Sequence, residues 1–191
     1  LVGSEMCIRD RILNATAAVF NSVCHIIPDN VIVLFENLWW PGLKLLEPGL
    51  VEKFFSLLKT KNVGIMLDTG HLMNTNMYLT DELAGIAYIC QVLDKLGDLK
   101  HLIKGVHLSC SLSGEYQQQF AKVVPPKIDF AALLTHIAKI DRHMPFSDTG
   151  VSEILEKVQP QYLVHELFYD SLSDMSAKLS QQQRACGVRS R

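Results

Sequence analysis

The sequence lacks a paired cysteine motif of the C-x-x-C type. Its five cysteines are scattered along the chain, at Cys7, Cys24, Cys90, Cys110 and Cys186. Such spacing gives no disulfide framework and favours free thiols in a reducing compartment. We therefore expect a cytoplasmic protein whose cysteines have no metal-binding or bridging role.

An excess of charge and long hydrophobic runs are also missing. The chain has 18 Lys and Arg against 20 Asp and Glu, for a formal net charge of −2. This balance argues against a general binder of nucleic acids or membrane surfaces. No apolar stretch reaches the ~18 residues that a membrane-spanning helix needs. With 191 residues, 48% of them hydrophobic, the chain is long enough to form a buried core.

The first ten residues, LVGSEMCIRD, have no apolar core and are not a signal peptide. They match, residue for residue, the translation of a transposase sequencing adapter. We therefore expect residues 1–10 to be a non-native scar, and we expect a natural N-terminal part to be missing from the chain. Residues 11–191 are then the native sequence.

Apolar runs of strand length alternate with segments of helical periodicity along the rest of the chain. Runs such as VIVLFE and VGIMLD are typical of strands buried on both faces, and they predict parallel βα units. A doubly wound sheet and a TIM barrel both fit this alternation. The predicted strands are 31–36, 63–68, 103–109 and 162–168, and the predicted helices are 12–26, 50–62, 80–96, 128–140, 152–159 and 171–185.

Each of the four predicted strands ends on a side chain that can bind a metal. The strands VIVLFE, VGIMLD, IKGVH and YLVHE finish at Glu36, Asp68, His107 and Glu166. Because the carboxyl ends of parallel strands lie at one edge, these side chains should converge there. Three carboxylates and an imidazole would need a cation between them, so the pattern predicts a divalent metal site. For any one residue alone, a helix cap or loop position is the alternative.

Two further histidines lie beside these strand ends. His71 follows Asp68 by three residues and should reach the site from a loop, or else bond to the loop backbone. His165 precedes Glu166, so strand alternation should turn it toward the helices as a packed residue rather than a ligand.

The strand ends carry a resemblance to a known family. FEN at 35–37, LDTGH at 67–71, GVHLS at 105–109 and LVHE at 163–166 occur in the order and spacing of the xylose isomerase-like TIM-barrel superfamily. This superfamily holds sugar (phosphate) isomerases and epimerases together with the endonuclease IV-type enzymes, AP endonuclease family 2. The resemblance spans about residues 12–180. It implies an α/β fold, the (β/α)8 barrel of ~250 residues, of which residues 11–191 would be the C-terminal half with strands five to eight.

The epimerase branch of that superfamily implies a function. There, residues matching Glu36, Asp68, His107 and Glu166 bind one divalent metal, and the residue matching His71 contacts substrate. The two glutamates exchange a carbon-bound proton through an enediolate. We thus expect a metal-dependent isomerase or epimerase of a sugar or sugar phosphate, with Mn²⁺, Mg²⁺, Co²⁺ or Zn²⁺. An arginine often found after the third-strand histidine is missing here.

The aromatic pair Trp39 and Trp40 follows the first strand directly. Trp39 is a candidate substrate-binding residue, because an indole can stack on a sugar face. Capping of a barrel rim is the equal alternative for both rings.

Two alternative functions stay open. Asp141 and His143, in DRHMPF, match an Asp-x-His that binds an additional zinc in endonuclease IV-type enzymes, although a turn before Pro145 also explains them. An abasic-site DNA endonuclease is thus the second enzyme hypothesis, although the charge balance makes nucleic acid an unexpected partner. The third is a non-catalytic barrel or inactive fragment. By itself the 191-residue chain should be inactive and poorly stable, with two open sheet edges.

Overall fold

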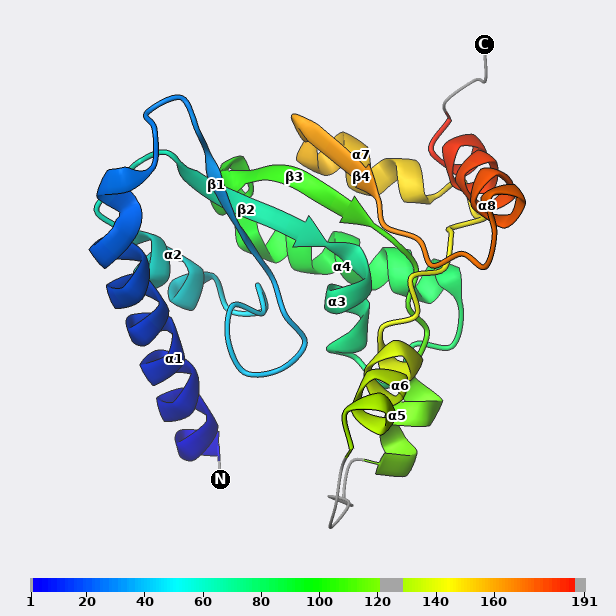
Figure 1. Cartoon of the computed structure of the whole chain (residues 1–191), viewed down its shortest axis with the longest axis horizontal. Coiled ribbons are helices and arrows are strands. Elements are labelled where there is room, and N and C mark those ends of the chain that lie inside the picture. The colour runs from blue at the N-terminus through cyan, green and yellow to red at the C-terminus, as the bar shows by residue number, and fades with distance from the viewer. Residues whose placement is uncertain (1, 121–128, 188–191) are drawn as a thin grey trace.

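The computed structural model contains one parallel sheet, whose four strands follow each other in chain order (Figure 1). The structure describes residues 2–120 and 129–187. Each predicted strand is present, which confirms the α/β class and the parallel arrangement. The strands are β1 (Val33–Glu36), β2 (Val63–Asp68), β3 (Ile103–Leu108) and β4 (Tyr162–His165).

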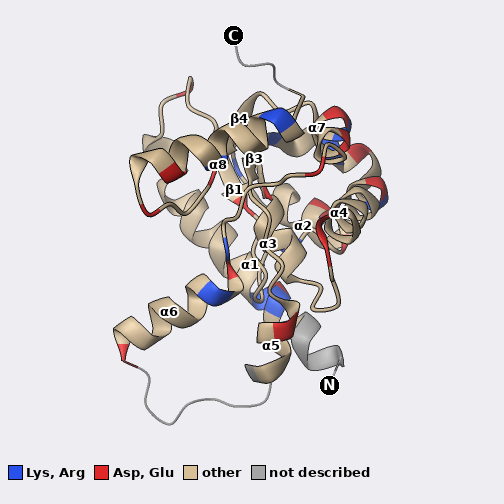
Figure 2. Cartoon of the chain, turned by 90° about the vertical axis from the view of Figure 1, so that its right-hand side faces the viewer, with Lys and Arg blue, Asp and Glu red and all other residues tan. Residues whose placement is uncertain are grey.

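Helices connect the strands, as the alternating pattern predicts. α5 and α6 project together away from the sheet in both views (Figures 1 and 2). No helix within the described residues is both long and apolar enough to cross a membrane. The helices are α1 (Val2–Val23), α2 (Pro48–Ser56), α3 (Thr69–Asn74), α4 (Glu82–Leu96), α5 (Gly114–Phe120), α6 (Phe130–Ile140), α7 (Val151–Val158) and α8 (Leu172–Ala185), with 3-10 turns η1 (Cys24–Ile26) and η2 (Gly97–Leu102).

Three local expectations need correction. The helix predicted over 80–96 begins after Asp81, whose carboxylate caps α4 by accepting from the Ala84 N–H, and Thr80 donates to Asp81 from outside the helix. The segment after β2 is the helix α3 rather than a loop, because Asp68 caps it directly by accepting from the His71 N–H. α5 lies inside the stretch 111–140, where only one helix was expected.

Residues 2–10, part of the segment expected to be a scar, form one helix with the residues that follow, α1. Arg9 forms an ion pair of 2.7 Å with Glu47, and Asp10 one of 2.7 Å with Lys53 of α2. Surface pairs of this kind contribute little stability, so these contacts say nothing about whether the residues are native.

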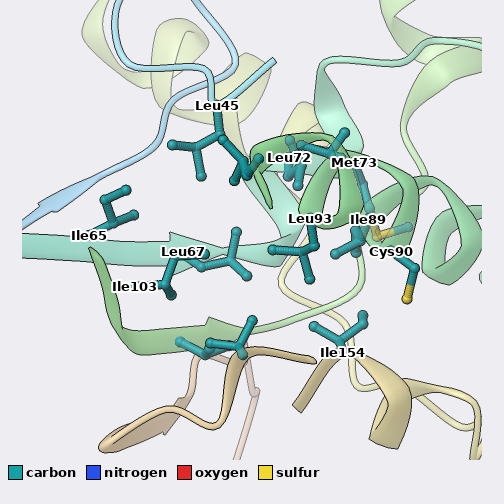
Figure 3. Packing of buried hydrophobic residues seen from close by; sticks show 14 of the residues in the cluster. Leu45, Ile65, Leu67, Leu72, Met73, Ile89, Cys90, Leu93, Ile103 and Ile154 are labelled. Carbon is teal, nitrogen blue, oxygen red and sulfur yellow. The ribbon is translucent and has the colours of Figure 1, made fainter. Parts of the chain in front are cut away.

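Helices cover one face of the sheet and leave the other for the strand-end side chains. Ile65 and Leu67 of β2 are fully buried, and they belong to one apolar cluster with Ile89 and Leu93 of α4 and Ile154 of α7 (Figure 3). Successive strand residues point to opposite faces. Asp68 therefore lies on the opposite face of β2 from Leu67.

Close packing on this opposite face explains two strand glycines. A Cβ at Gly105 would meet the Met66 side chain at 2.7 Å, and one at Gly64 would meet Leu34 at 3.0 Å. The glycines thus make room for Leu34 and Met66, which lie below the carboxyl ends of the strands.

The outer edges of β1 and β4 are unpaired in the part of the chain that the structure describes. β1 pairs with β2, and β4 pairs with β3. Tyr162, Leu163 and Val164 of β4 are 51%, 37% and 44% exposed. Since three consecutive strand residues include both faces, β4 is largely uncovered on each side.

Candidate metal centre

The four side chains predicted from the strand ends meet at one point. Ligand atoms of Glu36, Asp68, His107 and Glu166, here called the ligand group, all lie within 4.8 Å of one another. Nδ1 of His107 is 3.7 Å from Glu36 Oε1, 3.8 Å from Asp68 Oδ2 and 2.9 Å from Glu166 Oε2. Ligands of one cation with bonds near 2.1 Å are roughly 3–4 Å apart. The group could therefore hold one metal ion, as the sequence predicts.

Unsatisfied polar atoms within the ligand group support this fit. Asp68 Oδ2, His107 Nδ1 and Glu166 Oε2 are buried and make no hydrogen bond of acceptable geometry, despite the short distance between the last two. Buried polar atoms without a partner are costly and uncommon in folded proteins. Three such atoms close together fit a group that could hold a positively charged ion.

The charges of the ligand group are strongly coupled. The neighbouring Glu166 and Glu36 carboxylates raise the pKa of His107 to about 10. Hydrogen bonds from His107 and, to a smaller extent, from His71 lower the pKa of Glu36 to about 2. The His107 proton thus serves as the counter-charge that a cation would replace.

Asp68 is the most deeply buried member of the ligand group, with no exposed surface. Burial raises its pKa to about 7, against the opposing effect of His71. Its Oδ1 accepts from the His71 N–H at 2.6 Å, which leaves Oδ2 directed at the other ligands. One carboxylate therefore both caps α3 and offers a ligand atom.

A second polar cluster lies beside the ligand group. Asp141 Oδ2 is 3.1 Å from Nε2 of His71 and 2.7 Å from Nε2 of His143, and all three residues are buried. We call these three residues the histidine cluster. His143 Nδ1 is 3.2 Å from the Glu166 carbonyl oxygen, so the cluster joins the end of β4. The fold thus brings Asp141 and His143 to the strand ends, although a turn before Pro145 also explained them in the sequence.

Within the histidine cluster, the electrostatics differ from those of the ligand group. Burial opposes ionisation, but Asp141 and Glu36 together raise the pKa of His71 to about 10. Burial likewise opposes the effect of the two histidines on Asp141, and the net result is a lowered pKa of that carboxyl. His143 adopts a φ of +43°, in a backbone region that costs about 1–3 kcal/mol for a residue other than glycine. Ion pairs therefore hold the histidine cluster together, and His143 takes part in it with a strained backbone.

The predicted substrate contacts are placed as follows. The Trp39 ring lies 4.6 Å from the His71 ring, and Trp40 is 46% exposed. Both ring nitrogens of His71 already have partners, Asn37 O at 2.8 Å and Asp141. A substrate contact by His71 or by Trp39 remains a prediction.

His165 lies on the helix side, as expected from strand alternation. Its Nδ1 is 2.9 Å from Nε2 of Gln182 in α8, and burial lowers its pKa. The side chain is not part of the ligand group.

Two residues that hold the site were not singled out in the sequence. The Asn37 side chain hydrogen-bonds to the backbone of Asp68, and Thr69 Oγ1 donates to the Ser109 carbonyl at 2.7 Å while accepting from its N–H. Each lies one position beyond a strand end. The signal available in the sequence was a short polar residue directly after a residue of a kind that binds metals.

Comparisons with known proteins give no relatives. No protein-family model, no curated protein and no solved structure matches the chain. The site geometry therefore stands without support from a named family.

Proposed function

We propose that this chain carries the metal centre of an isomerase or epimerase that acts on a sugar or sugar phosphate. One observation carries the proposal: the ligand atoms of Glu36, Asp68, His107 and Glu166 converge at the carboxyl ends of four adjacent strands. Three of these atoms lack any other partner. This is the ligand set that the resemblance to the xylose isomerase-like superfamily implies.

The sheet order supports a partial barrel as the scaffold. In a doubly wound sheet the strand order reverses at a switch point, whereas barrel strands follow the chain order. The order here is β1-β2-β3-β4. The unpaired outer edges of β1 and β4 fit a segment of a larger closed sheet, with these strands as the last four of a (β/α)8 barrel.

The two glutamates have the exposure that acid–base catalysis needs. The side chains of Glu36 and Glu166 are 34% and 38% exposed, while Asp68 is fully buried. They come from the ends of the outermost strands, so a substrate held at the metal centre would lie within reach of both carboxylates. An ionised glutamate accepts the carbon-bound proton and, now protonated, can return it to the neighbouring carbon in an isomerase. In an epimerase the opposite glutamate, once it carries a proton, returns one to the other face of the same carbon.

The ionisation of the site suits this role. His107 lowers the pKa of Glu36 and of Glu166, so both are ionised and able to accept a proton at neutral pH. A divalent cation, when bound, supplies polarisation of a substrate carbonyl and adjacent hydroxyl. Three carboxylates and one imidazole favour Mn²⁺, with Mg²⁺, Co²⁺ and Zn²⁺ as alternatives.

The test combines metal analysis with proton exchange. In a longer protein that completes the barrel, Glu36→Gln and Glu166→Gln should each lower metal content and abolish exchange of solvent deuterium into a panel of aldoses, ketoses and their phosphates. Glu156→Gln, at an exposed position of α7, is the matched control. Unchanged metal content and exchange in both glutamate variants would refute the proposal.

A second function is favoured by the histidine cluster. Asp141 and His143 match the additional zinc ligands that the resemblance to endonuclease IV-type enzymes implies, and the structure places them 2.7 Å apart, with His71 3.1 Å from Asp141. Against it, the net charge is −2, and the ribbon in Figure 2 shows basic and acidic positions interspersed along the chain. Incision of an abasic site in duplex DNA by the zinc-loaded protein would favour this second function.

A further inference from the structure

Asn37 occupies the first position after β1, directly beside the ligand Glu36. Its side chain has no exposed surface. The amide makes two hydrogen bonds to one residue: Oδ1 accepts from the Asp68 N–H at 2.8 Å, and Nδ2 donates to the Asp68 carbonyl at 3.0 Å. A side-chain amide thus pairs with Asp68 as a residue of a neighbouring strand would.

This side-chain pairing takes the place of the backbone hydrogen bonds between β1 and β2, which end before Asp68. The last register pair of β1 and β2 is Glu36 with Met66. Beyond it, the Asn37 N–H reaches the Met66 carbonyl at 3.4 Å, which is long for a backbone hydrogen bond. Asp68 lies two residues further along β2, where β1 offers no backbone partner. The Asn37 amide is what ties Asp68 to the end of β1.

The consequence concerns the spacing of two ligands. Asn37 follows Glu36 in the chain, and its side-chain amide bonds to both the N–H and the carbonyl of Asp68. Asn37 therefore sets the separation of the Glu36 and Asp68 carboxylates. Its own carbonyl accepts from His71 Nδ1 at 2.8 Å, and the His71 N–H holds Asp68 Oδ1 at 2.6 Å. Groups that orient metal ligands in this way commonly change metal affinity by 10- to 100-fold.

We propose that Asn37 is a positioning residue of the metal centre, which fixes Asp68 relative to Glu36 through its side-chain amide. The inference rests on the proposed metal centre and adds to it a residue that is not itself a ligand. Only an amide of this length supplies both the donor and the acceptor. An aspartate would lack the donor and place an oxygen against the Asp68 carbonyl, and a leucine would offer neither group.

The experiment measures Co²⁺ and Mn²⁺ affinity by calorimetry, and the visible absorption of the Co²⁺-saturated protein, for Asn37→Asp and Asn37→Leu. We expect affinity to fall about 10- to 100-fold and the Co²⁺ spectrum at saturation to change, because the ligand geometry changes. Asn37→Asp adds a negative charge, which by itself would strengthen cation binding, so weaker binding by this variant reports geometry.

Asn62→Asp is the matched control. The Asn62 side chain also donates to a backbone carbonyl, that of Asp29 at 2.7 Å, but it precedes β2 at the opposite end of the same two strands. The metal affinity and the Co²⁺ spectrum of the Asn62→Asp variant should equal those of the wild type.

The outcomes separate the two proposals. If the wild type binds Co²⁺ and the folded Asn37 variants bind it within twofold, or bind it more weakly with an unchanged spectrum at saturation, Asn37 has no positioning role and the metal centre stands. If the wild type binds neither metal, the metal centre and the role of Asn37 are both refuted. Should Asn37→Leu fail to fold, Asn37→Asp and Asn37→Ser decide, since both keep a polar group facing Asp68.

Discussion

The ligand group and the histidine cluster lie side by side at the same end of the sheet, but their polar atoms are satisfied differently. The ligand group has three carboxylates and one imidazole, and three of its buried atoms lack hydrogen-bond partners. The histidine cluster has one carboxylate and two imidazoles, and Asp141 Oδ2 is close to both rings. Asp141 Oδ1 of the histidine cluster also lacks a hydrogen-bond partner, but that cluster has more imidazoles than carboxylates, so of the two groups the ligand group has the excess of negative charge.

This difference teaches how to recognise a cation site. A cluster whose imidazoles neutralise its carboxylate can be stable by itself, since each buried charge has a partner. A cluster with more carboxylates than imidazoles keeps an uncompensated charge, and burial adds to its cost by raising the pKa of Asp68 to about 7. We therefore expect one metal ion per chain, in the ligand group. Four measurements can test or refine this comparison.

The largest effect is expected from Asp68→Asn. The variant keeps an oxygen for the His71 N–H but removes the buried charge, so metal affinity should fall about 100-fold or more. Without metal, the variant should unfold at a higher temperature than the wild type above pH 7, where the buried carboxylate destabilises the fold. Titration calorimetry and thermal unfolding measure both. Asp94→Asn, at an exposed ion pair with Lys157, is the control, and equal affinities for the two variants would contradict the assignment.

The next effect is a pH dependence of metal affinity. The His107 pKa, raised from 6.5 to about 10, means that a bound cation must displace a proton at neutral pH. Affinity should therefore rise about tenfold per pH unit from about pH 7 to 9. Asp68 adds a second displaced proton at lower pH.

The stability of the metal-free protein should depend on pH in the opposite direction, falling as pH rises. The contribution of protonated His107 to stability is complete below pH 6.5 and is lost as pH rises through about 10. Calorimetry in two buffers of different ionisation enthalpy counts the released protons. A metal affinity that does not change with pH would contradict the displacement of the His107 proton.

A smaller effect is expected from Gly70→Ala, between the two clusters. A Cβ there would meet Ser109 Oγ at 2.7 Å and the Oδ1 atoms of Asp68 and Asp141 at 3.4 Å. We expect about 1–3 kcal/mol of destabilisation and less than a tenfold loss of metal affinity. Gly49→Ala in α2, where nothing lies within 4 Å, should instead gain up to about 1 kcal/mol. Similar stability changes in both variants would mean that the space at Gly70 is not restricted.

The smallest effect on metal binding is expected from Asp141→Asn. The variant should change affinity in the ligand group by no more than about twofold, while weakened pairing of His71 and His143 lowers stability by about 1–3 kcal/mol. Elemental analysis should find one metal ion per wild-type chain. Two or more ions in the wild type, with one lost in the variant, would show that the histidine cluster also binds metal and would favour the endonuclease.

Local sequence signals were sufficient for most elements of the fold. β2 has the bounds 63–68 that its apolar run predicts, and Gly97, with a φ of +56°, ends α4 as expected. α3 was missed because its six residues are too few for a periodic pattern, and the capping role of Asp68 was only an alternative to its role as a metal ligand. β4 is shorter than predicted, ending at His165, because its pairing with β3 stops there.

By itself, the sequence determined the parallel βα order and the convergence of Glu36, Asp68, His107 and Glu166, because strand alternation and a common carboxyl edge follow from local pattern alone. Only the tertiary structure decided that His71 and Asp141, 70 residues apart, meet across the rim, and that Asn37 ties Asp68 to β1. Contacts of this kind depend on how connecting segments fold back over the sheet, and no periodicity in the sequence encodes that path.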